Sequence, residues 1–266
     1  MKILKAIILA AGEGKRLRPL TKNNPKCLVD LFGKPLLEWQ INLMKKCGID
    51  DIIVVTGYKK EKLKNCSVKL IHNKKYAETN MVETLFLASN EFESPLIVSY
   101  GDIIYEKNIL ESLLNSPDDI SLVIDNQWKK YWEKRFNDPL SDAESLILQD
   151  NYITSLGQKV NSYQQICGQY IGLMKFQGSS IELIKKFYAQ KRNESKKGKN
   201  PLNESLPFEK SYLTDFLNSL IKENVKIKAV KTNNGWLEID TISDYDLYNK
   251  LYKNDKLSDL INLSEC

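Results

Sequence analysis

The N-terminal part of the chain contains the feature that most limits its fold. An apolar run from Ile3 to Leu9 leads into a loop with glycines at positions 12 and 14, and such a run is typical of a strand buried in a parallel sheet. The glycines let the backbone approach a ligand and point its N–H groups at phosphate oxygens. Four cations follow them: Lys15, Arg16, Arg18 and Lys26. Together these residues indicate a binding site for a polyphosphate.

The spacing of the glycines excludes two common phosphate-binding loops. A P-loop requires a second glycine five positions after the first, and a dinucleotide-binding loop requires a small residue at that same position. Here the position is occupied by Leu17. An ordinary strand-to-helix turn is the structural alternative, but such a turn has little reason to carry several neighbouring cations.

The remaining apolar and amphipathic segments predict an α/β protein. Strands are expected over residues 52–55, 68–71, 95–100, 120–124, 145–149, 152–156, 167–176 and 225–230. Helices are expected over residues 35–46, 80–90, 178–192 and 208–222, and from Thr241 through Lys253. This order predicts a Rossmann-like three-layer sandwich around a mostly parallel mixed sheet.

Composition narrows the class of protein. The net charge of the 266 residues is +5 and is spread along the chain, so we expect no nucleic-acid partner. The five cysteines lack C-x-x-C spacing, which favours reduced thiols over disulfides or a zinc site. The sequence has no signal peptide and no apolar stretch of membrane-spanning length, so we expect a cytoplasmic protein without membrane insertion. The sequence leaves open whether the chain forms a homodimer.

Gly101 and Asp102 follow the strand predicted at residues 95–100. Ligands of open α/β sheets bind at the carboxyl ends of the strands, which is where these two residues would lie. The glycine would let a ligand come close, and the aspartate offers hard oxygens to a cation. A turn-forming aspartate is the alternative. Asn80 likewise has two possible roles, as a binding-site residue or as a helix N-cap, because Asn80 and Glu83 have the spacing of a helix capping box.

The run from Leu9 to Thr21, continued by Pro25-Lys26, resembles a long signature of nucleotidyltransferases. These enzymes join a nucleoside triphosphate to a phosphorylated acceptor. The resemblance implies the nucleotide-diphospho-sugar transferase fold, which is GT-A-like. It implies one nucleotidyltransferase domain over residues 1–253, with residues 125–165 and 195–240 as acceptor-side elaborations. Residues 254–266 are expected to form a polar tail that frays.

The resemblance also implies a role for each charged residue of the site. Arg16 would bind the β- and γ-phosphates, Lys26 would bridge the α-phosphate and the acceptor phosphate, and Lys159 would supply a second lysine near them. The cofactor would be Mg²⁺, with Asp102 and Asp240 as its ligands. The nucleotide would contact Leu9, Ala10, Ala11, Gly12, Glu13, Gly14, Thr79, Asn80 and Gly101.

Further motifs resemble the phosphocholine cytidylyltransferase-like group. They include Trp236-x-Glu238-Ile239-Asp240-Thr241 and Gly168-x-Tyr170. Members of this group use CTP and small phosphorylated amino alcohols, phosphonates or a phosphorylated amino acid such as phosphoglutamine. The expected partners are therefore CTP and such an acceptor, and the expected use is the decoration of surface polysaccharide or lipid.

The residues allow two kinds of acceptor site. The guanidinium of Arg135 could hold an acceptor carboxylate. An ammonium group could instead lie in a cage of Tyr170, Glu238 and the tryptophans at positions 128, 132 and 236, although core packing is the alternative for each aromatic residue. Two other functions are weighed against cytidylyl transfer: a sugar-1-phosphate nucleotidyltransferase using UTP or dTTP, and a non-catalytic nucleotide sensor.

Overall fold

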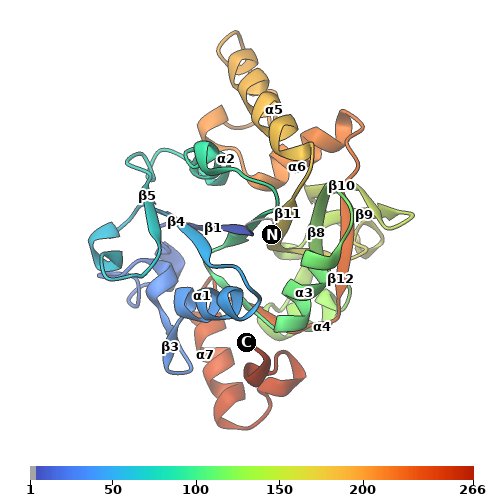
Figure 1. Cartoon of the computed structure of the whole chain (residues 1–266). Helices are drawn as coiled ribbons and strands as arrows, with labels where there is room; N and C mark the ends of the chain where they lie inside the picture. Colours follow the sequence, from blue (N-terminus) through green and yellow to red (C-terminus); the bar gives the residue numbers. More distant parts are fainter. Residues whose placement is uncertain (1–3) are drawn as a thin grey trace.

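A nine-stranded sheet runs through the computed structural model, which describes residues 4–266 (Figure 1). Its strand order is β5-β4-β1-β6-β11-β8-β12-β10-β9. The bounds are β1 Lys5–Ala10, β4 Asp51–Thr56, β5 Lys69–His72, β6 Leu96–Tyr100, β8 Ile120–Asp125, β9 Glu144–Gln149, β10 Tyr152–Lys159, β11 Gln169–Phe176 and β12 Lys228–Thr232. Of these strands, β10 and β11 run against the others. The predicted mostly parallel mixed sheet is confirmed.

Helices cover both faces of this sheet. They are α1 Leu36–Lys46, α2 Met81–Phe86, α3 Lys107–Asn115, α4 Trp128–Arg135, α5 Ser180–Ser195, α6 Leu213–Lys222 and α7 Ile242–Lys253. One hydrophobic cluster contains α1, α3, α4 and α7, and the other contains α2, α5 and α6. Alternate residues of β1 enter different clusters, Ile8 the first and Ile7 the second, because successive side chains of a strand point to opposite faces. The chain is therefore a three-layer sandwich, as predicted.

Two short ribbons complete the regular structure. The strands β7 Ile103–Tyr105 and β13 Trp236–Glu238 pair antiparallel, and so do β2 Asp30–Leu31 and β3 Lys34–Pro35. Short 3₁₀ helices occupy Lys15–Leu17, Lys26–Leu28, Lys60–Leu63, Ser89–Glu91, Pro139–Ser141, Tyr163–Gln165, Phe208–Lys210, Leu257–Asp259 and Leu263–Glu265. The β7–β13 ribbon matters most for the site, because it brings segments far apart in the sequence together.

Two predicted helices differ from the structure. The helix expected over residues 80–90 begins with an Asn80 N-cap, but α2 ends at Phe86 and Glu83 pairs with Arg192 instead of completing a capping box. The helix expected over residues 208–222 is divided into a 3₁₀ turn and α6. The division has a local cause, because Tyr212 is extended and its N–H donates to the Asp215 carboxylate at 2.8 Å.

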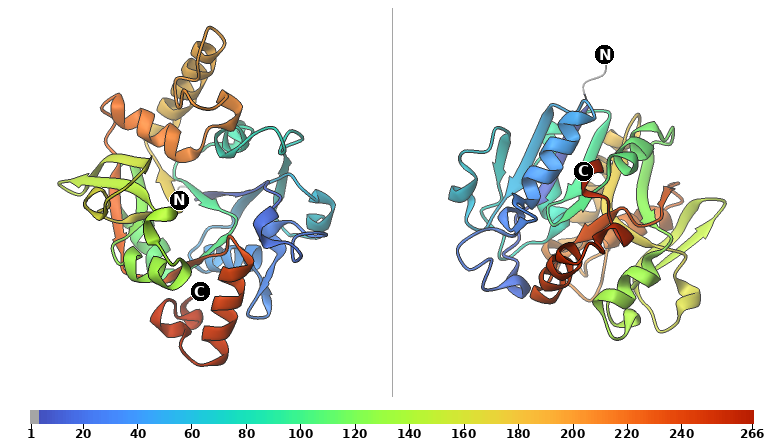
Figure 2. Two further views of the ribbon diagram at one scale, coloured as in Figure 1. Left: turned by 180° about the vertical axis from the view of Figure 1, so that it is seen from behind. Right: turned by 90° about the horizontal axis from the view of Figure 1, so that it is seen from below.

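The last residues do not form the fraying polar tail that we expected. Leu257, Leu260, Ile261 and Cys266 are buried and belong to the cluster that contains α1 and α7. The Lys46 ammonium on α1 donates to the Cys266 carbonyl at 2.7 Å. Figure 2 shows these C-terminal turns, in dark red, lying beside α1, in blue. Residues 254–266 are therefore part of the packed domain.

The segments expected as elaborations contribute to the main sheet. Residues 125–165 supply β9 and β10, and residues 195–240 supply β12, which lies between β8 and β10. No helix within residues 4–266 combines the length and the apolar character needed to cross a membrane.

Candidate active site

A cleft of about 540 Å³ opens at the carboxyl ends of β1 and β6. It contains predicted residues from five separate segments: Leu9, Ala10, Ala11, Gly12, Glu13, Gly14, Arg16, Lys26, Thr79, Asn80, Gly101, Asp102 and Asp240. This position agrees with the general rule that open α/β sheets bind ligands beyond the carboxyl ends of their strands. The structure thus brings together most of the residues selected from the sequence.

Backbone contacts hold the two strand ends at the floor of the cleft. The Gly101 N–H donates to the Leu9 carbonyl at 2.9 Å. A Cβ atom on Gly101 would lie 2.7 Å from that carbonyl oxygen, so only glycine fits there. Gly14 has a φ of +61°, and its carbonyl accepts a hydrogen bond from the Thr21 hydroxyl at 2.8 Å. These glycines bring the loop and the strand end close enough to form one wall.

Lys26 lies at the centre of the charged groups of the cleft. Its ammonium donates to Asp102 at 2.6 Å and also to Asp240, whose other oxygen accepts from Arg16 at 2.9 Å. Burial alone would lower the pKa of Lys26, but the two carboxylates raise it above its ordinary value. Burial also disfavours the charged form of Asp240, yet Lys26 and Arg16 hold the pKa of Asp240 below its ordinary value. Lys26 and Asp240 are therefore both charged at neutral pH.

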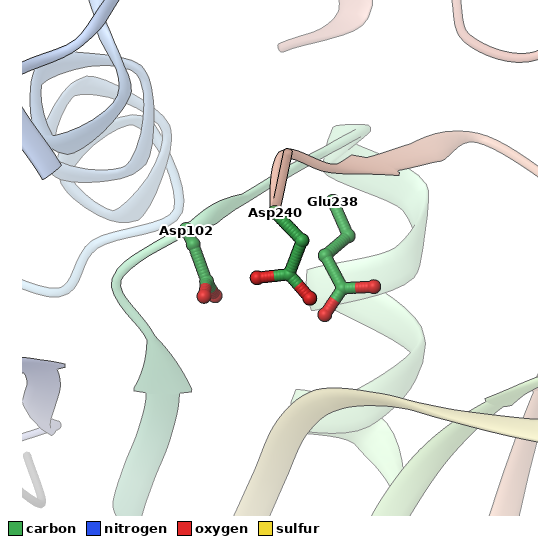
Figure 3. Close-up of side chains that lie close together, drawn as sticks. All are labelled: Asp102, Glu238 and Asp240. Carbon is green, nitrogen blue, oxygen red and sulfur yellow. The ribbon is translucent and has the colours of Figure 1, made fainter. Parts of the chain in front are cut away.

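Three carboxylates converge beside Lys26. Asp102, Glu238 and Asp240 each offer one oxygen, and these oxygens lie within 4.8 Å of one another. Figure 3 shows the three side chains pointing the same way, Asp102 from the turn after β6, Glu238 from the end of β13 and Asp240 from the segment that follows it. Asp102 Oδ1 is buried and finds no hydrogen-bond partner among residues 4–266. Burial, and next the Asp240 charge, raise the pKa of Glu238 to about 8. Hard oxygens, one of them unpartnered, fit a cation such as Mg²⁺.

Arg135 does not face the cleft, contrary to the role we expected. Its side chain is fully buried and donates to Glu238 at 2.9 Å and to Asp244 at 2.9 Å. The fork that was predicted to hold an acceptor carboxylate is thus already bound to two carboxylates of the protein. Burial alone would lower the pKa of Arg135, but Glu238 raises it, so the guanidinium stays charged.

Two further predicted residues lie outside the lining of the cleft: Lys159, expected near the reacting phosphates, and Tyr170, expected on the acceptor side. Lys159 is exposed at the end of β10. Tyr170 packs edge-on against Tyr100, with ring centroids 5.7 Å apart. The expected aromatic cage does not form from the tryptophans, because Trp128, Trp132 and Trp236 are buried in the core. Core packing, the alternative considered for these aromatics, is what the structure shows.

Several residues that line the cleft were not expected there from the sequence. Lys210 and Tyr212 enter it from the 3₁₀ turn before α6, and Tyr76 enters it from the loop before α2. The Asn80 N–H donates to the Glu209 carbonyl at 2.8 Å, and this hydrogen bond joins the 3₁₀ turn to the loop before α2. Tyr76 precedes Thr79-Asn80 in a recognisable motif and could have been selected. Lys210 and Tyr212 carried no such signal, since their position depends on a contact between distant segments.

The comparison with protein families decides the classification. The family described as the MobA-like NTP transferase domain matches residues 6–157. The chain belongs to this family. The matched region contains the glycine loop, Lys26, Thr79-Asn80 and Asp102, whereas Glu238 and Asp240 lie beyond it.

Similar proteins extend the likeness of this NTP transferase over most of its length. A CTP:phosphoglutamine cytidylyltransferase from Campylobacter jejuni is 40% identical over 255 residues, which is 92% of this chain and 98% of that protein. A choline-phosphate cytidylyltransferase from Streptococcus pneumoniae is 40% identical over 42% of this chain and 51% of its own length. The solved structure of the CTP:phosphocholine cytidylyltransferase from Streptococcus pneumoniae has a TM-score of 0.73 at 26% identity, covering 95% of this chain and all of that one.

Proposed function

We propose that this chain is a Mg²⁺-dependent cytidylyltransferase, which transfers CMP from CTP to the phosphate of a small amino-containing acceptor and releases pyrophosphate. One observation carries the proposal: Arg16, Lys26, Asp102 and Asp240 come from separate segments and contact one another in a single cleft. The long similarity to the phosphoglutamine cytidylyltransferase supports the choice of CTP.

The reaction has to overcome charge repulsion more than it needs a base. An acceptor phosphate oxygen, already an anion, forms a bond to the α-phosphorus of CTP while the bond from the α-phosphorus to the pyrophosphate oxygen breaks. Cations fixed in place stabilise the charge that develops on the leaving group. Arg16, whose side chain is 63% exposed at the cleft, is suited to bind the pyrophosphate part. Lys26 lies deeper, with a side chain 14% exposed, and is suited to bind the reacting phosphates.

Asp102, Glu238 and Asp240 would hold Mg²⁺ in this proposal. Their carboxylate oxygens lie within 4.8 Å of one another, and the unpartnered Asp102 Oδ1 offers a free oxygen for a cation. When bound, Mg²⁺ supplies charge neutralisation at the triphosphate. Glu238 joins the two ligands expected from the sequence, in place of the acceptor-binding role first assigned to it.

The acceptor we favour is a phosphorylated amino acid of the phosphoglutamine type, because the relative with that name is similar over nearly its full length. Phosphocholine is the next acceptor to test, given the similarity in sequence and structure to choline-phosphate enzymes. Lys159 keeps its proposed place near the reacting phosphates and Tyr170 its proposed place on the acceptor side, whereas Arg135 does not. The proposal also includes a cytoplasmic location, where CTP is available, and a role in surface polysaccharide or lipid decoration. Size-exclusion chromatography would test for a homodimer.

Pyrophosphate release tests the function directly. CTP, UTP, dTTP and ATP are each combined with Mg²⁺ and with phosphoglutamine, phosphocholine, phosphoethanolamine, 2-aminoethylphosphonate or glucose-1-phosphate. We expect release with CTP and an amino-containing acceptor. Release with glucose-1-phosphate and UTP or dTTP alone would replace the proposal by a sugar-1-phosphate nucleotidyltransferase. CTP binding without release from any pair would favour a nucleotide sensor.

The metal role is tested with the variant Asp240→Asn. The variant should require a higher Mg²⁺ concentration for half-maximal activity, because it removes one of three converging carboxylates. The matched control is Asp246→Asn, which changes an exposed aspartate on α7, the helix that follows Asp240. Equal Mg²⁺ titrations for the two variants would remove Asp240 from the metal site.

A further inference from the structure

Arg135, on α4, connects the carboxylate of Glu238, at the end of β13, with that of Asp244, in the first turn of α7. Its Nη1 donates to Glu238 at 2.9 Å, and its Nε and Nη2 donate to the two oxygens of Asp244 at 2.9 and 3.2 Å. The Arg135 side chain is fully buried and that of Asp244 is 2% exposed. A guanidinium that makes a two-pronged contact with one carboxylate and a further contact with a second fixes the position of both.

Asp244 transmits this constraint to the backbone that carries Asp240. Its Oδ2 accepts hydrogen bonds from the Asp240 N–H at 3.0 Å and from the Thr241 N–H at 2.9 Å. The Thr241 hydroxyl in turn accepts from the Asp244 N–H, which completes the capping box of α7. Arg135 therefore reaches Asp240 through one intermediate side chain, without any contact with Asp240 itself.

Two tyrosines fix the backbone at Glu238 from the same side. The Tyr131 hydroxyl, one turn before Arg135 on α4, accepts from the Glu238 N–H at 2.9 Å. The Tyr248 hydroxyl of α7 donates to the Glu238 carbonyl at 2.9 Å. Both tyrosine rings are buried. Side chains of α4 thus fix the positions of both Glu238 and Asp240. They contact Glu238 directly and Asp240 through Asp244.

We propose that Arg135 is a positioning residue for the metal site, acting through Asp244 on Asp240 and directly on Glu238. This inference rests on the metal role given to those carboxylates under the proposed function. Residues that orient metal ligands in this way set metal affinity, and their loss weakens it about 10- to 100-fold. The parts of the cleft wall that we expect to bind the nucleotide, at Ala11 and Asn80, make no contact with this network. CTP binding in the absence of metal should therefore not depend on it.

The experiment measures Mn²⁺ binding to the full chain from the electron paramagnetic resonance signal of free Mn²⁺, with no nucleotide present. The variants are Arg135→Lys, which keeps the charge but loses the fork, and Asp244→Asn, which weakens the fork from the other side. The matched control is Arg192→Lys, because Arg192 contacts Glu83 at 2.6 and 2.7 Å in another part of the molecule. Thermal unfolding and metal-free CTP binding are measured for each protein.

We expect Arg135→Lys and Asp244→Asn to bind Mn²⁺ about 10-fold more weakly than the wild type or more weakly still, with CTP binding changed less than about twofold. Arg192→Lys should lose thermal stability and keep its Mn²⁺ affinity. Lower stability with unchanged Mn²⁺ affinity in both test variants would overturn the proposal and leave Arg135 a purely structural residue. Absence of Mn²⁺ binding by the wild type would instead refute the metal role in the proposed function, and the positioning role would fall with it.

Discussion

Replacing Lys26 by methionine should strengthen metal binding and at the same time nearly abolish turnover. The Lys26 ammonium contacts both Asp102 and Asp240, so it occupies the space where a divalent cation would meet their oxygens. Methionine has a similar length and no charge. The substitution therefore frees the two carboxylates and removes the cation that we assign to the reacting phosphates.

The size of both effects can be worked from these contacts. A hydrogen bond to a charged group contributes about 1.5–3 kcal/mol, so a cation that displaces both Lys26 contacts loses at least about 3 kcal/mol. Because 1.4 kcal/mol corresponds to a factor of ten, Lys26→Met should bind metal roughly 100-fold more tightly when no nucleotide is present. Loss of one fixed group that stabilises transition-state charge costs about 10²- to 10³-fold in kcat.

Isothermal titration with Mg²⁺ and a pyrophosphate-release assay measure the two effects on the same protein. The variant should also unfold at a lower temperature than the wild type without metal, because Asp102 and Asp240 each lose the Lys26 ammonium as a partner, and Mg²⁺ should restore most of the loss. The reasoning is refuted if Mg²⁺ binding by Lys26→Met is unchanged or weaker than that of the wild type. Turnover within threefold of the wild type would refute the catalytic role.

Three further predictions concern the cleft wall, Glu238 and the C-terminal turns. Gly57→Ala should raise the KM for CTP and lower stability, because its Cβ atom would lie 2.4 Å from the Ala11 carbonyl oxygen and 2.5 Å from Tyr76 Cβ; steady-state kinetics that match the wild type would contradict this. Glu238→Gln should change how stability depends on pH. Burial raises the pKa of Glu238 in the folded chain to about 8, so the free energy of unfolding of the wild type should fall as the pH rises from the ordinary carboxyl pKa toward 8, whereas that of the variant should not fall for this reason; parallel pH profiles from urea unfolding would count against it. Deleting residues 257–266 should remove roughly 5 kcal/mol or more, since each buried leucine or isoleucine contributes about 1.5–3 kcal/mol and three of them are lost; a truncated chain with unchanged urea stability would show that these turns are dispensable.

The glycine loop and the strands around it could be predicted because their signals are local. Apolar runs between glycine and charged residues indicate buried strands, and β1, β4 and β6 lie close to where the pattern put them. Asp102 follows β6 directly, so the rule for strand ends located it. The contacts of Lys26 with Asp102 and Asp240 agree with the grouping expected from the nucleotidyltransferase resemblance.

Arg135 shows why other assignments failed. Its neighbours in sequence are polar and aromatic, a composition shared by exposed binding helices and by helices that pack on a core. The difference lies in Glu238 and Asp244, more than one hundred positions away, whose carboxylates pair with the buried guanidinium. The spacing of Thr241 and Asp244 is compatible with the capping box that the structure shows, but no local pattern indicates that Arg135 holds it. The C-terminal turns were misjudged for a similar reason, since a few apolar residues among polar ones do not show which surface will bury them.

The register of the β7–β13 ribbon connects these features to the chemistry. Glu238 pairs with Ile103, and the Ile239 N–H donates to the Asp102 carbonyl at 3.1 Å. Because side chains alternate along a strand, a shift of one residue would place Ile239 where the carboxylates now converge. Three-residue strands hold their register weakly by themselves, so contacts beyond the ribbon must fix it. Trp236 Nε1 donates to the buried Asp125 at 3.0 Å, and the Gly235 N–H donates to the Leu260 carbonyl at 2.7 Å. The C-terminal turns and the buried aromatic core therefore support the strand that positions Glu238 and Asp240, the carboxylates that we propose as metal ligands. A change in either support should alter the geometry of these carboxylates.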